Sequence, residues 1–181
     1  MRFLEDFMKR SIELWQLMGF ALSTLFGTLL HFLYDFTGKS CLAALFSGVN
    51  ESTWEHMKLL LWPMLLYAIF ESFFFRERGD FWCVKLRGIL LGLLLIPVIF
   101  YTYNGAIGKS PDWLNVTIFF VSAAIAFAYE ARRFNVEEKP CKRPWLAITL
   151  LAFLAVLFIV FTFKTPEIGI FKDPLTGMSG I

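Results

Sequence analysis

The sequence is poor in charged residues and in cysteine. Charged residues make up 18% of the 181-residue chain, whereas a soluble domain usually carries roughly a quarter. Hydrophobic residues reach 57% and include 22 phenylalanines, which is more apolar surface than one water-soluble core of this size can bury. With only three cysteines, the composition excludes a cytosolic globular enzyme, a secreted disulfide scaffold and a disordered regulator, and it indicates a membrane protein.

Five apolar stretches are long enough to cross a bilayer, which takes about 20 residues of helix. They do not alternate polar and apolar residues as the strands of a membrane barrel would. We therefore predict an all-α integral membrane bundle, a single domain over residues 1–181 with about five transmembrane helices. The predicted spans are 12–34, 53–75, 81–101, 113–129 and 145–163.

The number of Lys and Arg residues alternates between high and low from one segment outside the spans to the next. From the amino-terminal segment to the carboxyl tail the counts are 3, 1, 4, 1, 5 and 2. Excess Lys and Arg mark the cytoplasmic side of a membrane. The pattern predicts a multi-pass protein of the cell membrane with a cytoplasmic amino terminus and an extracytoplasmic tail, 164–181.

This orientation predicts on which side of the membrane each cysteine lies. Cys41 is expected outside, and Cys83 and Cys141 are expected near the reducing cytoplasmic face. Disulfides are rare on that side, so we expect no disulfide framework.

Two segments outside the predicted spans, the first loop and the tail, have sequences that predict local structure. The apolar run 41–46, between Gly38 and Gly48, is too short to span and predicts a short interfacial or re-entrant helix in the first loop. The tail is rich in Gly and Pro, which indicates turns. Its apolar residues favour packing on the outer face, as a lid over an outward site, whereas a disordered tail is the simpler alternative.

Several ligand classes are excluded by missing motifs. Two Gly-Lys-Ser runs, 38–40 and 108–110, lack the first glycine of a phosphate-binding loop. No basic stripe with interleaved aromatic residues indicates nucleic-acid binding. We expect neither a nucleotide nor a nucleic acid as partner, but the lipid bilayer and a small-molecule or lipid-like substrate.

Polar residues gather at one predicted depth, where the first span ends and the second begins. His31 and Asp35 are four positions apart and share a helix face. His56 lies about one turn inside the second span, and the chain has only these two histidines. Imidazole and carboxylate groups together suit Zn, Mn or Fe, so His31, Asp35 and His56 are the predicted metal ligands.

Further residues near this level complete the predicted site. Glu51 and Glu55 are candidate catalytic carboxylates, since a carboxylate can accept a proton from metal-bound water. The candidate substrate-binding residues are Asn50, Trp54, Lys58, Tyr103 and Asn104.

Structural roles compete with these assignments. Ser52 and Glu55 have the spacing of a capping box, and Glu55 can pair with Lys58 on the same helix. Asp35 can simply end its helix in water. Glu71 lies too far along its span to join the cluster, and we expect it to pair with Arg76, Arg78 or Lys85.

The same segments carry a family resemblance. The motifs His31-Phe32-x-Tyr34-Asp35, Leu45-Phe46-Ser47 and Asn50-Glu51-Ser52-x-Trp54-Glu55-His56-x-Lys58, with Asp173-Pro174-x-Thr176-Gly177 in the tail, resemble an uncharacterised family of small bacterial polytopic membrane proteins, a domain of unknown function. The resemblance implies a bacterial origin and an integral membrane fold, and it supplies no reaction.

Three functions remain open at this point. The first is a metal-dependent membrane hydrolase or transferase with an outward-facing His/carboxylate site. The second is a small-solute or ion transporter, or a membrane substrate-binding subunit, that uses the same cluster. The third is a structural or accessory membrane subunit in which the cluster only caps and pairs helices.

Overall fold

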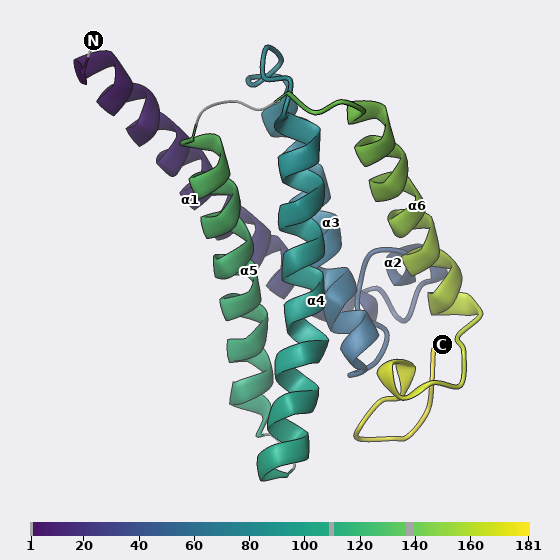
Figure 1. The fold of residues 1–181 in the computed structure, drawn as a ribbon. Coiled ribbons are helices and arrows are strands. Elements are labelled where there is room, and N and C mark those ends of the chain that lie inside the picture. Colours follow the sequence, from purple (N-terminus) through teal and green to yellow (C-terminus); the bar gives the residue numbers. More distant parts are fainter. Residues whose placement is uncertain (1, 109–110, 137–139) are drawn as a thin grey trace.

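The computed structural model describes residues 2–108, 111–136 and 140–181. Part of the second Gly-Lys-Ser run and one basic residue of the fourth connection, Lys139, lie outside these residues. Within them the chain is all-helical, with no named strand. The elements are α1 (Arg2–Phe36), α2 (Cys41–Ala44), α3 (Thr53–Ser72), α4 (Phe81–Ile107), α5 (Asp112–Phe134), α6 (Pro144–Phe163) and the short 3-10 helix η1 (Gly169–Phe171) (Figure 1).

The five long helices overlap the five predicted spans, and the all-helical architecture confirms the predicted helical bundle. Four of them contain a stretch long and apolar enough to cross a membrane, namely Ser11–Phe36, Phe81–Ile107, Trp113–Phe134 and Pro144–Phe163. The fifth, α3, is as long as α6 but less apolar, because it carries Glu55, Lys58 and Glu71. The predicted number of spans therefore depends on α3.

Helix α3 is the centre of the bundle, since it contacts each of the other long helices. Leu60, Leu61 and Ala68 are fully buried along it. Helix α1 crosses α3 closely at Gly27, where a Cβ atom would lie 2.8 Å from the carbonyl oxygen of Leu59. Because neighbouring helices shield α3 from its surroundings, it can carry charged side chains that a lipid-facing helix could not.

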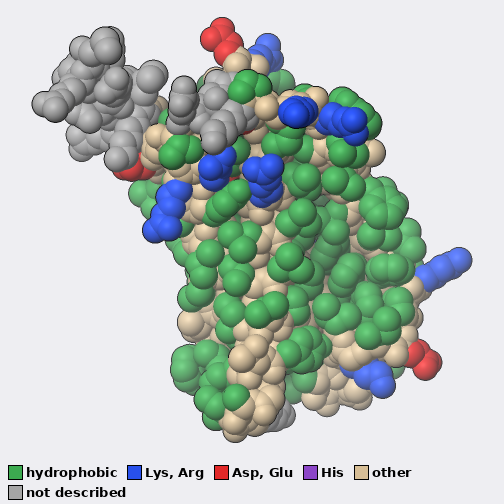
Figure 2. Space-filling view, in the orientation of Figure 1, with side chains coloured by type: hydrophobic (Ala, Val, Ile, Leu, Met, Phe, Trp, Pro, Cys, Tyr) green, Lys and Arg blue, Asp and Glu red, His purple; other side chains and the backbone are tan. Residues whose placement is uncertain are grey.

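The two ends of the bundle differ in charge. The basic end holds the start of α1, the α3–α4 connection and the start of α6, and Figure 2 shows Lys and Arg side chains gathered there. The tail end holds the first loop, the α4–α5 connection and the carboxyl-terminal tail (Figure 1). On the face in view, most of the coloured side chains between the two ends are apolar (Figure 2).

The first loop folds back against α3 through its backbone carbonyls. Lys58 donates to the carbonyl oxygen of Ala44 at 2.9 Å, and the Trp62 indole donates to that of Leu45 at 3.1 Å. These two side chains lie about one and a half and two and a half turns inside α3. The loop contains the short helix α2, as predicted. The loop therefore packs against the side of α3, inward from the tail end of the bundle.

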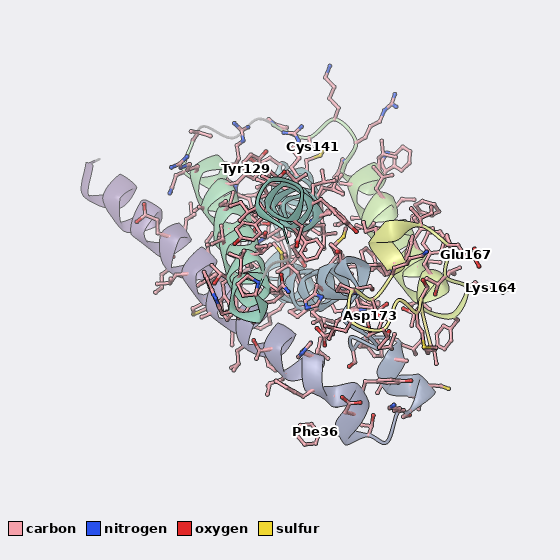
Figure 3. All side chains as sticks on the ribbon, turned by 90° about the horizontal axis from the view of Figure 1, so that it is seen from below. Phe36, Tyr129, Cys141, Lys164, Glu167 and Asp173 are labelled. Atoms are coloured by element: carbon pink, nitrogen blue, oxygen red, sulfur yellow. A yellow bond between two sulfur atoms is a disulfide. The ribbon has the colours of Figure 1, made fainter. Side chains whose placement is uncertain are left out.

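The tail is folded at the tail end of the bundle. The Asp173 side chain accepts hydrogen bonds from the Leu175 backbone and the Thr176 hydroxyl, at 2.7 and 2.9 Å. Phe171 is buried against Trp54, and the amide of Asn50 donates to the carbonyl oxygen of Gly180 at 3.0 Å. Viewed from this end, Asp173 lies toward the middle of the bundle and Phe36 at its edge (Figure 3).

The expectation of no disulfide is wrong for Cys83 and Cys141, which are bonded to each other with Cα atoms 6.1 Å apart. The prediction relied on the compartment alone and took no account of proximity. The backbone of Cys141 donates to the carbonyl oxygen of Gly79 at 3.1 Å, which places the segment before α6 beside the start of α4. Cys41 is free and exposed.

Candidate metal centre

Two imidazoles and one carboxylate meet at the tail end of the bundle. Glu51 lies between the histidines, with one oxygen 3.6 Å from His31 Nε2 and the other 3.5 Å from His56 Nε2. One potential ligand atom from each residue lies within 4.8 Å of the other two. Donor atoms around a tetrahedral zinc ion are roughly 3.3 Å apart, so small side-chain rotations would bring these three groups to ligand positions.

The start of α3 fixes the orientation of His56. The Ser52 side chain accepts a hydrogen bond from the backbone nitrogen of Glu55 at 3.3 Å and caps the helix, as the spacing of these residues predicted. The carbonyl oxygen of Ser52 lies 3.0 Å from His56 Nδ1. Since a carbonyl oxygen only accepts, Nδ1 is the donor of this bond, and Nε2 is the ring nitrogen that faces Glu51. Metal-ligating histidines in proteins are commonly held in this way.

A cavity of about 410 Å³ opens beside the three side chains. It lies between α1 and α5, with the base of α3 at its end. Its lining is mainly apolar and includes Phe32, Leu59, Val116, Phe119, Phe120 and Leu175. Leu175 belongs to the folded tail, so the tail borders the cavity without filling it.

The structure places two predicted site residues outside this group. Asp35 is exposed in the last turn of α1, about 6 Å further along the helix axis than His31, and Glu51 is the carboxylate that reaches the histidines. Glu55 directly precedes His56, so it points about 100° away around α3. It is buried, pairs with Lys58 and accepts a hydrogen bond from the Val49 backbone at 3.2 Å.

The predicted substrate-binding residues have other contacts. Lys58 is fully buried and donates to the Thr162 hydroxyl at 2.9 Å. Trp54 stacks on Phe158 with ring centroids 4.0 Å apart. Asn50 ties the first loop to the tail, as described above. Tyr103 and Asn104 are half-buried near the end of α4, and neither lines the cavity.

Asn115 is a polar residue near the cluster that the sequence analysis missed. It lies one turn inside α5 and lines the cavity together with His31, Glu51 and His56. The available signal was its depth, because a polar residue one turn inside a span lies at the level of the two histidines. Its amide can donate a hydrogen bond to a polar group bound beside the cluster.

Comparison with known proteins places the whole fold in one family. A model of a family of unknown function, DUF6512, matches residues 5–181. The chain is a member of DUF6512. No curated protein and no solved structure matches it.

Membership of DUF6512 confirms the resemblance to an uncharacterised family. The match includes the candidate metal centre, the first loop and the folded tail, because it runs from the first turns of α1 to the last residue.

Proposed function

We propose that this protein is a metal-dependent membrane hydrolase or transferase that acts on an amphipathic, lipid-like substrate. The proposal rests on the grouping of His31, Glu51 and His56 within 4.8 Å at the end of an apolar cavity. The three groups would hold one divalent ion, Zn, Mn or Fe.

Three protein ligands suit catalysis better than a purely structural role. Structural zinc sites are usually closed by four protein ligands, whereas catalytic sites combine three with a water molecule. The Glu51 side chain is 41% exposed and those of His31 and His56 are 33% and 21% exposed, so a fourth position is accessible. A bound divalent ion would supply a water that loses its proton near neutral pH.

The cavity indicates the class of substrate. Phe32 and Val116 line it, and they are 51% and 57% exposed on helices that can cross a membrane. An acyl chain can therefore enter from the bilayer between α1 and α5 and pack against Phe119. The polar head of such a molecule would then lie beside the histidines and Asn115.

The apolar layer next to the cluster favours a reaction at one end of the bundle over a transport path for solutes through it. Leu60, Leu61 and Met64 follow His56 on α3 and are almost completely buried. These apolar side chains separate the cluster from the basic end, which argues against the transporter alternative.

The charge difference between the ends supplies an orientation. We place the basic end in the cytoplasm, because Lys and Arg are retained there. The amino terminus is then cytoplasmic, and the metal centre faces the extracytoplasmic side of the cell membrane.

Metal content tests the proposal first. The purified full chain is loaded with Zn, Mn or Fe, freed of excess metal and analysed for its elements. We expect about one ion per chain in the wild type and in Asp35→Ala, and little in His31→Ala, His56→Ala or Glu51→Gln. Asp35→Ala is the matched control, since it removes a nearby carboxylate that lies outside the cluster.

Turnover tests the second step. Metal-loaded protein in lipid micelles is assayed against fluorogenic esters and phosphoesters with long and short acyl chains. We expect hydrolysis of long-chain substrates that depends on His56 and on metal. A wild type that retains no metal refutes the metal centre, and one that binds metal but turns over none of these substrates refutes the assigned chemistry.

A further inference from the structure

A second polar group lies at the basic end, where four helices each contribute one side chain. These are Gln16 from α1, Glu71 from α3, Lys85 from α4 and Glu130 from α5, which we call the buried tetrad. None of the four residues is more than 2% exposed. Of the three partners expected for Glu71, the structure selects Lys85.

The contacts within the buried tetrad centre on the lysine. The ammonium of Lys85 pairs with both Glu71 and Glu130. Gln16 donates to Glu71 at 2.5 Å, and its side-chain oxygen accepts from Lys85 at 3.4 Å. Aromatic rings enclose the ammonium group, with the Tyr67 and Phe134 centroids at 5.6 Å.

The charges of the buried tetrad do not balance when every group is ionised. Two carboxylates and one ammonium leave a net charge of −1 in a fully buried position, which is very costly in a low dielectric. Among the described residues, Oε1 of Glu130 has no hydrogen-bond partner. A neutral carboxyl oxygen tolerates this far better than a carboxylate oxygen does.

The neighbouring charged groups do not supply the missing positive charge. Arg78, in the α3–α4 connection, pairs with Asp80 at 3.0 Å and donates to the carbonyl oxygen of Phe134. Tyr67 of α3 is neutral and donates to the carbonyl oxygen of Trp15. Arg133 of α5 lies one turn beyond Glu130 and makes no ion pair among the described residues.

The packing leaves room for a proton more readily than for a metal ion. A Cβ atom on Gly88 would lie only 2.2 Å from Oε1 of Glu130, so this carboxyl group rests directly on the backbone of α4. We propose that the buried tetrad is a proton-binding site, in which Glu71 and Glu130 together hold one proton. Deprotonation would leave an uncompensated charge among α1, α3, α4 and α5 and loosen their packing.

Infrared spectroscopy tests the proton directly. The folded full chain, prepared with isotope-labelled glutamate, is measured at neutral pH for the carbonyl stretch of a protonated carboxyl group. We expect one buried protonated glutamate in the wild type and none in Glu130→Gln or Glu71→Gln, because either substitution neutralises the buried tetrad. Glu13→Gln, at an exposed position of α1, is the matched control and should keep the band.

Stability against pH is the second measurement. A folded protein that holds one proton more than its unfolded chain loses stability as pH rises, and its unfolded-to-folded ratio grows by up to about tenfold per pH unit. We expect this slope in the wild type and in Glu13→Gln, and a flatter one in Glu130→Gln. A wild type without the protonated band, or one whose stability depends on Na⁺ in place of pH, overturns the proposal.

Discussion

His56 donates a hydrogen bond from Nδ1 to the carbonyl oxygen of Ser52, 3.0 Å away. The acceptor is a backbone atom at the first turn of α3, so the ring is oriented by the helix itself. The second ring nitrogen then faces Glu51 at 3.5 Å. This relationship would preorganise His56 as a metal ligand, because the bond at Nδ1 holds the ring with Nε2 toward Glu51.

Metal affinity should fall in acid. Protons compete with a metal ion for the imidazole nitrogens, and the centre has two histidines. Once both rings are protonated, the apparent association constant for zinc should fall by up to roughly a hundredfold per pH unit. Zinc titration of the purified chain across the acidic range measures this slope.

A single-histidine variant provides the control for that titration. His31→Ala should bind zinc weakly, with a slope of at most about tenfold per pH unit, because one competing ring remains. Equal slopes in the wild type and His31→Ala would contradict a shared ion.

Lys58 and Glu55 should contribute to stability and not to turnover. Lys58→Met leaves the buried Glu55 carboxylate without its partner, which typically costs about 3–5 kcal/mol. The double variant Glu55→Leu/Lys58→Met removes both charges and should recover most of that loss while it still binds metal. Unfolding midpoints, metal content and turnover of the wild type and the two variants distinguish the roles. Normal stability of Lys58→Met with lost turnover would instead restore Lys58 as a substrate-binding residue.

The bundle could be predicted because the long helices are recognisable in the sequence from the length and apolar composition of their segments. Helix α6 begins and ends within one residue of its predicted span, 145–163. The central position of α3 was harder to predict. Its charged residues lower its hydropathy, and their burial becomes evident only from the helices that pack around α3. The Cys83–Cys141 bond was missed for the same reason, since it depends on two segments that meet only in the fold.

The grouping of the two histidines with carboxylates could be predicted, but the carboxylate that meets both rings could not. Helical spacing placed Asp35 on the same helix face as His31, but spacing within one helix cannot predict how the first loop folds back toward that face. Ser47 ties that loop to α1, since its hydroxyl donates to the carbonyl oxygen of Leu30 at 2.6 Å. The returning chain brings Glu51 to the level of the two rings, and this tertiary arrangement selects the carboxylate that joins them.

Filling the cavity should separate substrate binding from metal binding. Val116→Trp places a large ring in the cavity and should lower kcat/KM for long-chain substrates by at least about tenfold, while metal content stays the same. Val121→Trp is the matched control, because Val121 is exposed on the same helix and does not line the cavity. Equal kinetics of the two variants would place the acyl chain elsewhere.

The cysteines provide a test of orientation in living cells. With the basic end in the cytoplasm, an impermeant maleimide added to whole cells should label Cys41, which is exposed at the tail end. The structure joins Cys83 to Cys141 at the basic end, whereas cytoplasmic reductants keep most thiols reduced. The state of this bond in acid-quenched cells therefore tests the orientation. With the basic end in the cytoplasm, both cysteines should be alkylatable before exposure to air and bonded afterwards, and Cys83→Ser, which leaves Cys141 alone, is the control. A bond already present in quenched cells, together with an unlabelled Cys41, would reverse the orientation and place the metal centre on the cytoplasmic side.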